Sequence, residues 1–152
     1  MCNIPIAVTE EETVVRALFE CHVNKRKDKL RDNVFRPKPG SDKVSVMRHT
    51  YMKSDACKAK AKQIAANPTN PYVGLAAITV SDVRGVGSNV ADSREEFCGH
   101  ADICHGIVVP ADEPPDPILT LRVRALREKA RLLIDPDPAA KGWAGGQVEL
   151  PE

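Results

Sequence analysis

The sequence predicts one α+β domain, in which a sheet of three to five strands packs against two or three helices. The 152 residues fit a single domain, and 42% hydrophobic with 28% charged residues is typical of a globular protein. Apolar residues recur with a helical period in some segments and alternate with polar residues in others, in the order helix, strand, helix, strand, strand, helix. We expect residues 1–134 to form the domain and residues 135–152 to form a partly ordered tail.

Two helices and a strand are predicted in the first half of the chain. Thr9 and Glu12 have the spacing of a capping box, and the apolar residues after them recur with a helical period, which predicts a helix over 10–22. Apolar and polar residues alternate over 43–49, which predicts a strand. A capping serine and aspartate then predict a helix over 55–66.

Two strands and a helix are predicted in the second half. The longest uncharged apolar run covers 72–83 and is typical of a central strand buried on both faces. A second strand is predicted over 101–109. Asp116 and Pro117 are start signals for a helix over 118–134. The apolar stripe of this helix either packs on the domain or forms the seam of a homo-oligomer.

The cysteines predict a reducing compartment. Their number, five, is odd, and their positions show no paired spacing. No apolar signal segment follows Met1, and no run of 18 apolar residues is present. We therefore expect free thiols, a cytoplasmic location and no membrane contact.

Charge is segregated along the chain, although the net charge is only +1. Residues 25–38 hold seven Lys or Arg and two Asp, and residues 118–134 hold five Lys or Arg and one Glu. Either these basic segments face the acidic segment 82–117 within the fold, or they bind an acidic protein or a nucleic acid. The first functional hypothesis is therefore an interaction module that uses the basic loop 25–38 and an arginine-flanked last helix. Its expected ligand-binding residues are Arg36, Lys38, Arg124, Arg127 and Arg131.

The stretch 97–107 concentrates residues capable of chemistry. Alternation along a strand would place Cys98, His100 and Asp102 on one face. The alternative hypothesis is therefore a small enzyme acting on a phosphate-bearing or other anionic substrate. In it His100 is the general base, Asp102 orients the imidazole and Cys98 is a possible nucleophile. Arg48 and His49, at the end of the predicted strand 43–49, would bind the anion.

A third hypothesis is a structural zinc site built from Cys98, His100 and Cys104. Its geometry is unfavourable, because six residues of extended chain separate the two thiols by roughly 20 Å, whereas Zn–S bonds measure about 2.3 Å. In the alternative without metal, the thiols are ordinary buried side chains and the histidine is hydrogen-bonded. We expect no metal and no cofactor, since no cofactor-binding motif is present.

Overall fold

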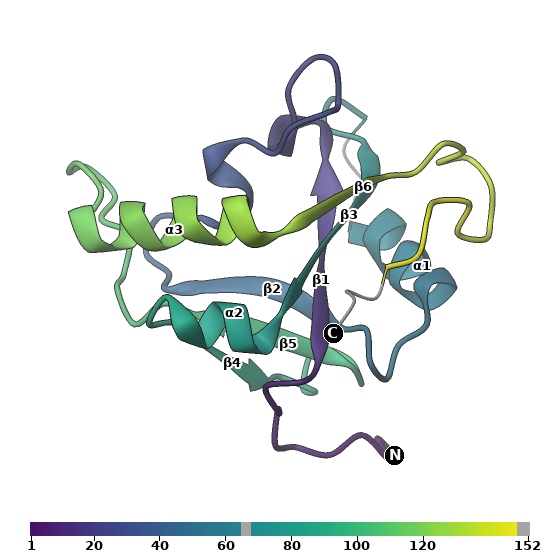
Figure 1. The fold of residues 1–152 in the computed structure, drawn as a ribbon, viewed down its shortest axis with the longest axis horizontal. Helices are drawn as coiled ribbons and strands as arrows, with labels where there is room; N and C mark the ends of the chain where they lie inside the picture. The colour runs from purple at the N-terminus through teal and green to yellow at the C-terminus, as the bar shows by residue number, and fades with distance from the viewer. Residues whose placement is uncertain (65–67, 149–152) are drawn as a thin grey trace.

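The computed structural model describes residues 1–64 and 68–148 and shows one sheet with helices on both of its faces (Figure 1). Six antiparallel strands form a single sheet in the order β4-β5-β2-β1-β3-β6. The strands are β1 Thr13–Phe19, β2 Lys43–Arg48, β3 Tyr72–Thr79, β4 Asn89–Asp92, β5 His100–Cys104 and β6 Arg131–Ile134. The helices are α1 Ser54–Ile64, α2 Val80–Gly85 and α3 Pro117–Lys129, with short 3-10 turns η1 Glu20–His22 and η2 Asp32–Phe35. The α+β class is confirmed, but six strands replace the expected three to five.

The helix predicted over 10–22 is wrong, because this segment forms β1 and the turn η1. β1 lies between β2 and β3 and is buried on both faces. Val14 and Leu18 contribute to one core cluster, whereas Val15 and Ala17 contribute to the other. A strand buried on both faces is apolar at successive positions and therefore does not alternate. Its apolar residues happened to match a helical period as well.

The last predicted helix is too long. α3 ends at Lys129, because Ala130 adopts an extended backbone conformation, and the chain continues as β6 beside β3. The predicted strand 72–83 divides similarly, since the hydroxyl of Thr79 accepts the Asp82 N–H and caps α2. The predicted strand 101–109 runs only from His100 to Cys104. The predicted helix 55–66 is confirmed as α1 up to Ile64, and its last two positions lie outside the described residues.

The two faces of the sheet are covered unequally. On the first face, α2, α3 and η2 pack over apolar side chains from all six strands. On the second face, α1 and the tail residues Trp143 and Val148 pack over β1, β3 and β6. The described apolar cluster of this second face includes only Met47 from β2 and no residue of β4 or β5. The part of the second face formed by β2 and β5 is therefore not covered by this apolar cluster, and a surface groove lies there.

The five cysteines are not all free, contrary to the expectation. Cys2 and Cys98 form a disulfide with a Cα–Cα distance of 5.4 Å, which joins the N-terminal segment to the loop before β5. Cys21, Cys57 and Cys104 are free thiols. Stable disulfides are typical of oxidising compartments, so the cytoplasmic location stays a prediction. No helix in the described part of the chain is long and apolar enough to cross a membrane.

Candidate functional site

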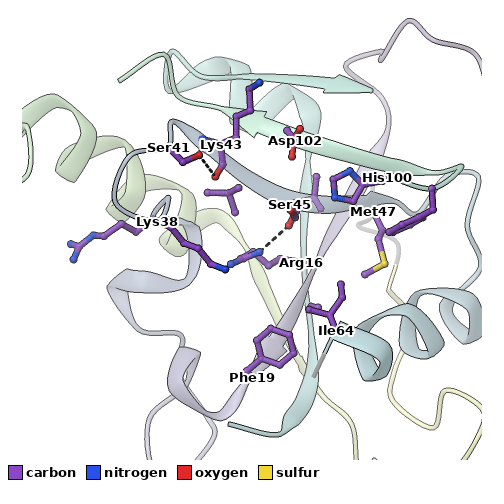
Figure 2. A pocket seen from close by; sticks show the side chains of 15 residues that line it. Arg16, Phe19, Lys38, Ser41, Lys43, Ser45, Met47, Ile64, His100 and Asp102 are labelled. Atoms are coloured by element: carbon purple, nitrogen blue, oxygen red, sulfur yellow. Dashed lines mark hydrogen bonds between the residues drawn. The ribbon is translucent and has the colours of Figure 1, made fainter. Parts of the chain in front are cut away.

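A groove of about 350 Å³ lies on the uncovered part of the second face (Figure 2). Side chains of β2 and β5 form its floor, and the loop that follows η2 forms one side. The end of α1 and Phe97 close the other side. Its described lining residues are Arg16, Ala17, Phe19, Arg36, Lys38, Ser41, Lys43, Val44, Ser45, Val46, Met47, Ile64, Phe97, His100 and Asp102.

The groove exists because β1 and β2 separate. Their pairing is confined to Val14 with Arg48 and Val15 with Met47. Beyond this point the Arg16 side chain bridges the two strands. Its Nε donates to the carbonyl of Val34 at 2.6 Å and its Nη1 donates to the carbonyl of Ser45 at 2.9 Å. A charged side chain thus replaces the ladder of backbone hydrogen bonds.

Arg16 has no carboxylate partner among the described residues, because both of its hydrogen bonds there are to neutral carbonyl groups. Burial lowers its pKa to about 10, so it still carries a full positive charge at neutral pH. Arg36, Lys38 and Lys43 are exposed around the same groove. Asp102 is the only acidic residue in the described lining. The groove therefore has an excess of positive charge.

His100 is held on the floor of the groove beside β2. It lies opposite Met47 in the β2–β5 register and is 6% exposed. The Nδ1 atom and the Ser93 hydroxyl are 2.5 Å apart, and the imidazole packs edge-on against Phe97 with ring centroids 5.0 Å apart. Its Nε2 has no hydrogen-bond partner in the described part of the chain. One ring nitrogen is thus fixed by the protein, and the other is available to a ligand.

Asp102 shares the face of β5 with His100, as the alternation predicted, and it lies opposite Ser45. No hydrogen bond links the Asp102 carboxylate to His100, because Ser93 holds the imidazole instead. The hypothesis that Asp102 orients His100 therefore finds no contact within residues 1–64 and 68–148. The carboxylate remains available to accept a hydrogen bond from a ligand.

Cys98, the predicted nucleophile, and Cys104, a candidate zinc ligand, lie in different chemical environments. The sulfur of Cys98 is bonded to Cys2, so it is not a free thiolate. Burial, followed by the charge of Asp102, raises the pKa of Cys104, which keeps this thiol protonated at neutral pH. No group of three His, Cys, Asp or Glu side chains with metal-binding geometry occurs among the described residues.

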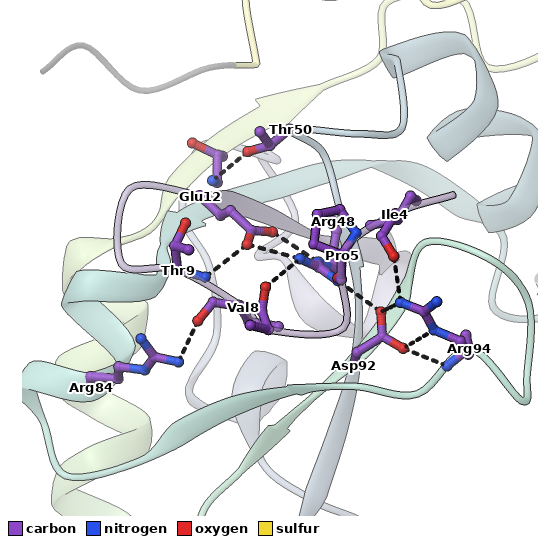
Figure 3. A network of polar contacts seen from close by, with 12 residues as sticks. Ile4, Pro5, Val8, Thr9, Glu12, Arg48, Thr50, Arg84, Asp92 and Arg94 are labelled. Carbon is purple, nitrogen blue, oxygen red and sulfur yellow. Dashed lines mark hydrogen bonds and ion pairs between the residues drawn. The ribbon is translucent and has the colours of Figure 1, made fainter. Parts of the chain in front are cut away.

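Arg48 lies at the centre of a buried polar network rather than in the groove (Figure 3). It is fully buried, and it forms ion pairs of 2.8 Å with both Glu12 and Asp92. Burial alone would lower the pKa of Arg48, but hydrogen bonds to these carboxylates raise it. Arg94 also pairs with Asp92. His49 lies outside the described groove lining, where its Nδ1 donates to the carbonyl of Met52.

The predicted arginines of the last helix lie away from the groove. Arg124 and Arg127 of α3 form ion pairs with Asp32 of η2 at 3.6 and 2.9 Å. Arg131 is exposed at the start of β6. Arg127 also lines a second, shallower hollow together with Lys29 of the basic loop. The two basic segments therefore do meet in space, whereas Arg36 and Lys38 lie at the groove.

Two cationic groove residues, Arg16 and Lys43, were not singled out from the sequence, and neither was Ser93, which contacts His100 from outside the described lining. The signal for Arg16 is a lone charge between apolar residues on both sides, but this signal disappears when the segment is interpreted as an amphipathic helix. Ser93 contacts His100 from seven residues away because the chain turns between β4 and β5. No pattern of spacing indicates that contact.

Comparison of the chain with models of protein families, with curated proteins and with solved structures finds no match.

Proposed function

We propose that this protein is a small interaction module that binds an acidic partner by placing an anionic group of that partner in the groove. The observation that carries the proposal is Arg16, a partly buried cation without a carboxylate partner in the described structure. Removing a charge from water costs free energy unless an opposite charge compensates it. An anion bound beside Arg16 would supply that charge, and Arg36, Lys38 and Lys43 would attract it to the groove.

The basic loop gives an acidic macromolecule a path beyond the groove. Arg36 and Lys38 line the groove, whereas Lys29 of the same loop lies with Arg127 in the second hollow. An acidic protein or a nucleic acid that entered the groove would thus meet further positive charge toward α3. Asp32 pairs with two arginines of α3, so part of the positive charge near α3 is already compensated. The positive charge at the groove is compensated less.

A titration with inorganic phosphate, followed by backbone amide NMR, tests the proposal. We expect chemical shift changes centred on Arg16, Ser45 and His100, because these residues surround the strand gap. The Arg36→Ala/Lys38→Ala variant should weaken phosphate binding at least fivefold. The matched control, Lys53→Ala/Lys62→Ala, removes two exposed lysines outside the described groove lining and should bind like the wild type.

The proposal fails if phosphate shifts no groove amide, or if both double variants weaken binding equally. A labelled polyglutamate and a labelled oligonucleotide, each titrated in competition with phosphate, then identify the class of macromolecule. A partner that uses the groove should displace phosphate, and one that uses only the α3 surface should not.

An acid–base enzyme is the second candidate, and the free Nε2 of His100 favours it. With Nδ1 held by Ser93, the imidazole can exchange a proton at Nε2 with a substrate that the groove cations position. Nucleophilic catalysis by cysteine is the less favoured route, because Cys98 is in the disulfide and Cys104 is protonated.

Turnover of a panel of anionic esters separates the enzyme from the binding module. An enzyme should lose activity on the order of 100-fold or more in His100→Gln, since general base catalysis contributes about that factor. Phosphate affinity should change little in the same variant. Absence of turnover by the wild type with every ester would leave the binding module as the only candidate.

A further inference from the structure

We propose that the groove binds a small molecule with two unlike ends, an anionic head and an apolar body about the size of one aromatic ring. This inference rests on the proposed function, because it assumes that the groove takes an anion. It adds a second occupant of the same groove, a free small molecule of stated chemistry that would compete with the acidic partner for the groove cations.

The first observation is that the charges lie at one end of the groove. Figure 2 shows Lys38, Ser41 and Lys43 on one side of the groove, with the Lys38 side chain extending toward Arg16 and the Lys43 side chain pointing away from it. Lys38 and Lys43 are exposed and form no ion pair in the described part of the chain. Two cationic side chains that approach each other, Lys38 and Arg16, are well suited to a phosphate or a carboxylate.

The second observation is that the other end is apolar. Figure 2 shows Phe19, Ile64 and Met47 grouped on the side away from the lysines. Phe97 lines the same groove, where it contacts the ring of His100. The Ile64 side chain is 55% exposed, so much of its apolar surface faces water. A bare inorganic anion would leave this surface exposed, whereas a ligand with an apolar body would bury it.

The third observation is the arrangement between the two ends. His100 and Asp102 follow one another on the floor of β5, between the charged and the apolar regions (Figure 2). They offer an imidazole nitrogen and a carboxylate that can fix the orientation of a ligand through hydrogen bonds. A groove of about 350 Å³, with apolar walls and a few convergent polar groups, has the size and composition of a small-molecule site.

Isothermal titration calorimetry with three probes tests the inference: inorganic phosphate, phenyl phosphate and phenol. Burial of one aromatic ring should make phenyl phosphate bind about tenfold more tightly than inorganic phosphate. Phenol should bind weakly or not at all, because it lacks the anionic head. Lys38→Ala should weaken the binding of both phosphates.

A matched pair of isoleucine variants tests the apolar end. Ile64→Ser should weaken phenyl phosphate about threefold or more and leave inorganic phosphate unchanged. Ile118→Ser is the control, because Ile118 is also 55% exposed but lies on α3, on the other side of the sheet. It should change neither affinity.

The outcomes separate the two proposals. Equal affinities for phenyl phosphate and inorganic phosphate would overturn the two-ended ligand and leave the anion-binding groove in place. Equal affinities for phenol and phenyl phosphate would overturn both, since the groove would then not recognise charge. If neither phosphate binds, both proposals are overturned.

Discussion

Arg16 and Arg48 lie on neighbouring strands, and their surroundings differ in burial and in the number of neighbouring carboxylates. Arg48 is fully buried between two carboxylates, and backbone carbonyls of the N-terminal segment accept its remaining hydrogen bonds. Arg16 is partly buried, but its described hydrogen bonds go only to two neutral carbonyl groups. The first charge is compensated inside the fold, whereas the second is open to the groove.

This difference shows how a structural arginine can be told from a ligand-binding one. Position does not separate them, because both follow apolar residues in a strand. The sign and number of the neighbouring charges do separate them. A compensated arginine stabilises the fold, and an uncompensated arginine that lines a groove is a candidate for binding an anion.

The largest expected effect is the contrast between Arg48→Met and Arg16→Met. Arg48→Met leaves the buried Glu12 carboxylate with only the Thr9 N–H and removes one of the two arginines paired with Asp92, which should lower the free energy of unfolding by about 3–5 kcal/mol. Arg16→Met removes a cation that had no carboxylate, so its cost should stay near 1–2 kcal/mol, the usual penalty for carbonyl groups that lose a donor. Urea unfolding of both variants measures the difference. Equal losses would show that the two arginines are equivalent structural residues.

Removal of the disulfide should have the next largest effect, and it should affect only the Arg48 side of the comparison. The bridge closes a sequence separation of 96 residues and holds the segment whose carbonyls accept hydrogen bonds from Arg48. Cys2→Ser/Cys98→Ser should therefore lose about 2–4 kcal/mol of stability in urea. Phosphate affinity should stay within twofold, since the described groove cations do not contact the bridge, although Phe97 beside Cys98 lines the groove.

Cys21→Ser is the control for that experiment, because Cys21 is an exposed free thiol. It should unfold like the wild type. A loss of phosphate affinity in the double variant, with Cys21→Ser unchanged, would show that the N-terminal segment also shapes the groove.

The pH dependence of stability should be sensitive to the charge of Arg16, because this charge contributes to the lowered pKa of His22. Burial, followed by the charge of Arg16, lowers the pKa of His22 to about 4, and its Nδ1 accepts the Phe19 N–H. Between pH 6.5 and 4 the unfolded chain binds a proton that the folded chain does not. Stability from this group is therefore complete above pH 6.5 and falls by up to roughly 3 kcal/mol toward pH 4.

Urea unfolding between pH 7 and pH 4.5 should show this loss, and His22→Gln should reduce it. The remaining slope is assigned in part to His105, whose pKa burial also lowers. Arg16→Met should raise the pKa of His22, measured by NMR, whereas Arg48→Met should not. An unchanged His22 pKa in Arg16→Met would mean that burial alone sets it.

The sequence predicted local features well where one face of an element is buried. Alternation placed His100 and Asp102 on one face of a strand, with Ala101 and Ile103 in the core on the other, and the structure agrees. It failed at β1, because a strand buried on both faces does not alternate. The groove itself could not be predicted, since it forms where two strands separate and is completed by residues from distant segments. The Cys2–Cys98 bridge is likewise a long-range contact that spacing does not indicate.

The smallest expected effect concerns Asp102, the one described carboxylate in the groove. Asp102→Asn keeps the shape of the side chain and removes a negative charge that repels an anionic ligand. At a separation of several ångströms in a water-filled groove, that repulsion is worth about 0.5–1 kcal/mol, so phosphate should bind about two- to fivefold more tightly. The gain should largely disappear in 1 M salt, where the screening length is about 3 Å. Weaker phosphate binding by Asp102→Asn would instead mean that Asp102 accepts a hydrogen bond that the complex needs, and the groove would then be compensated in the way that the Arg48 network is.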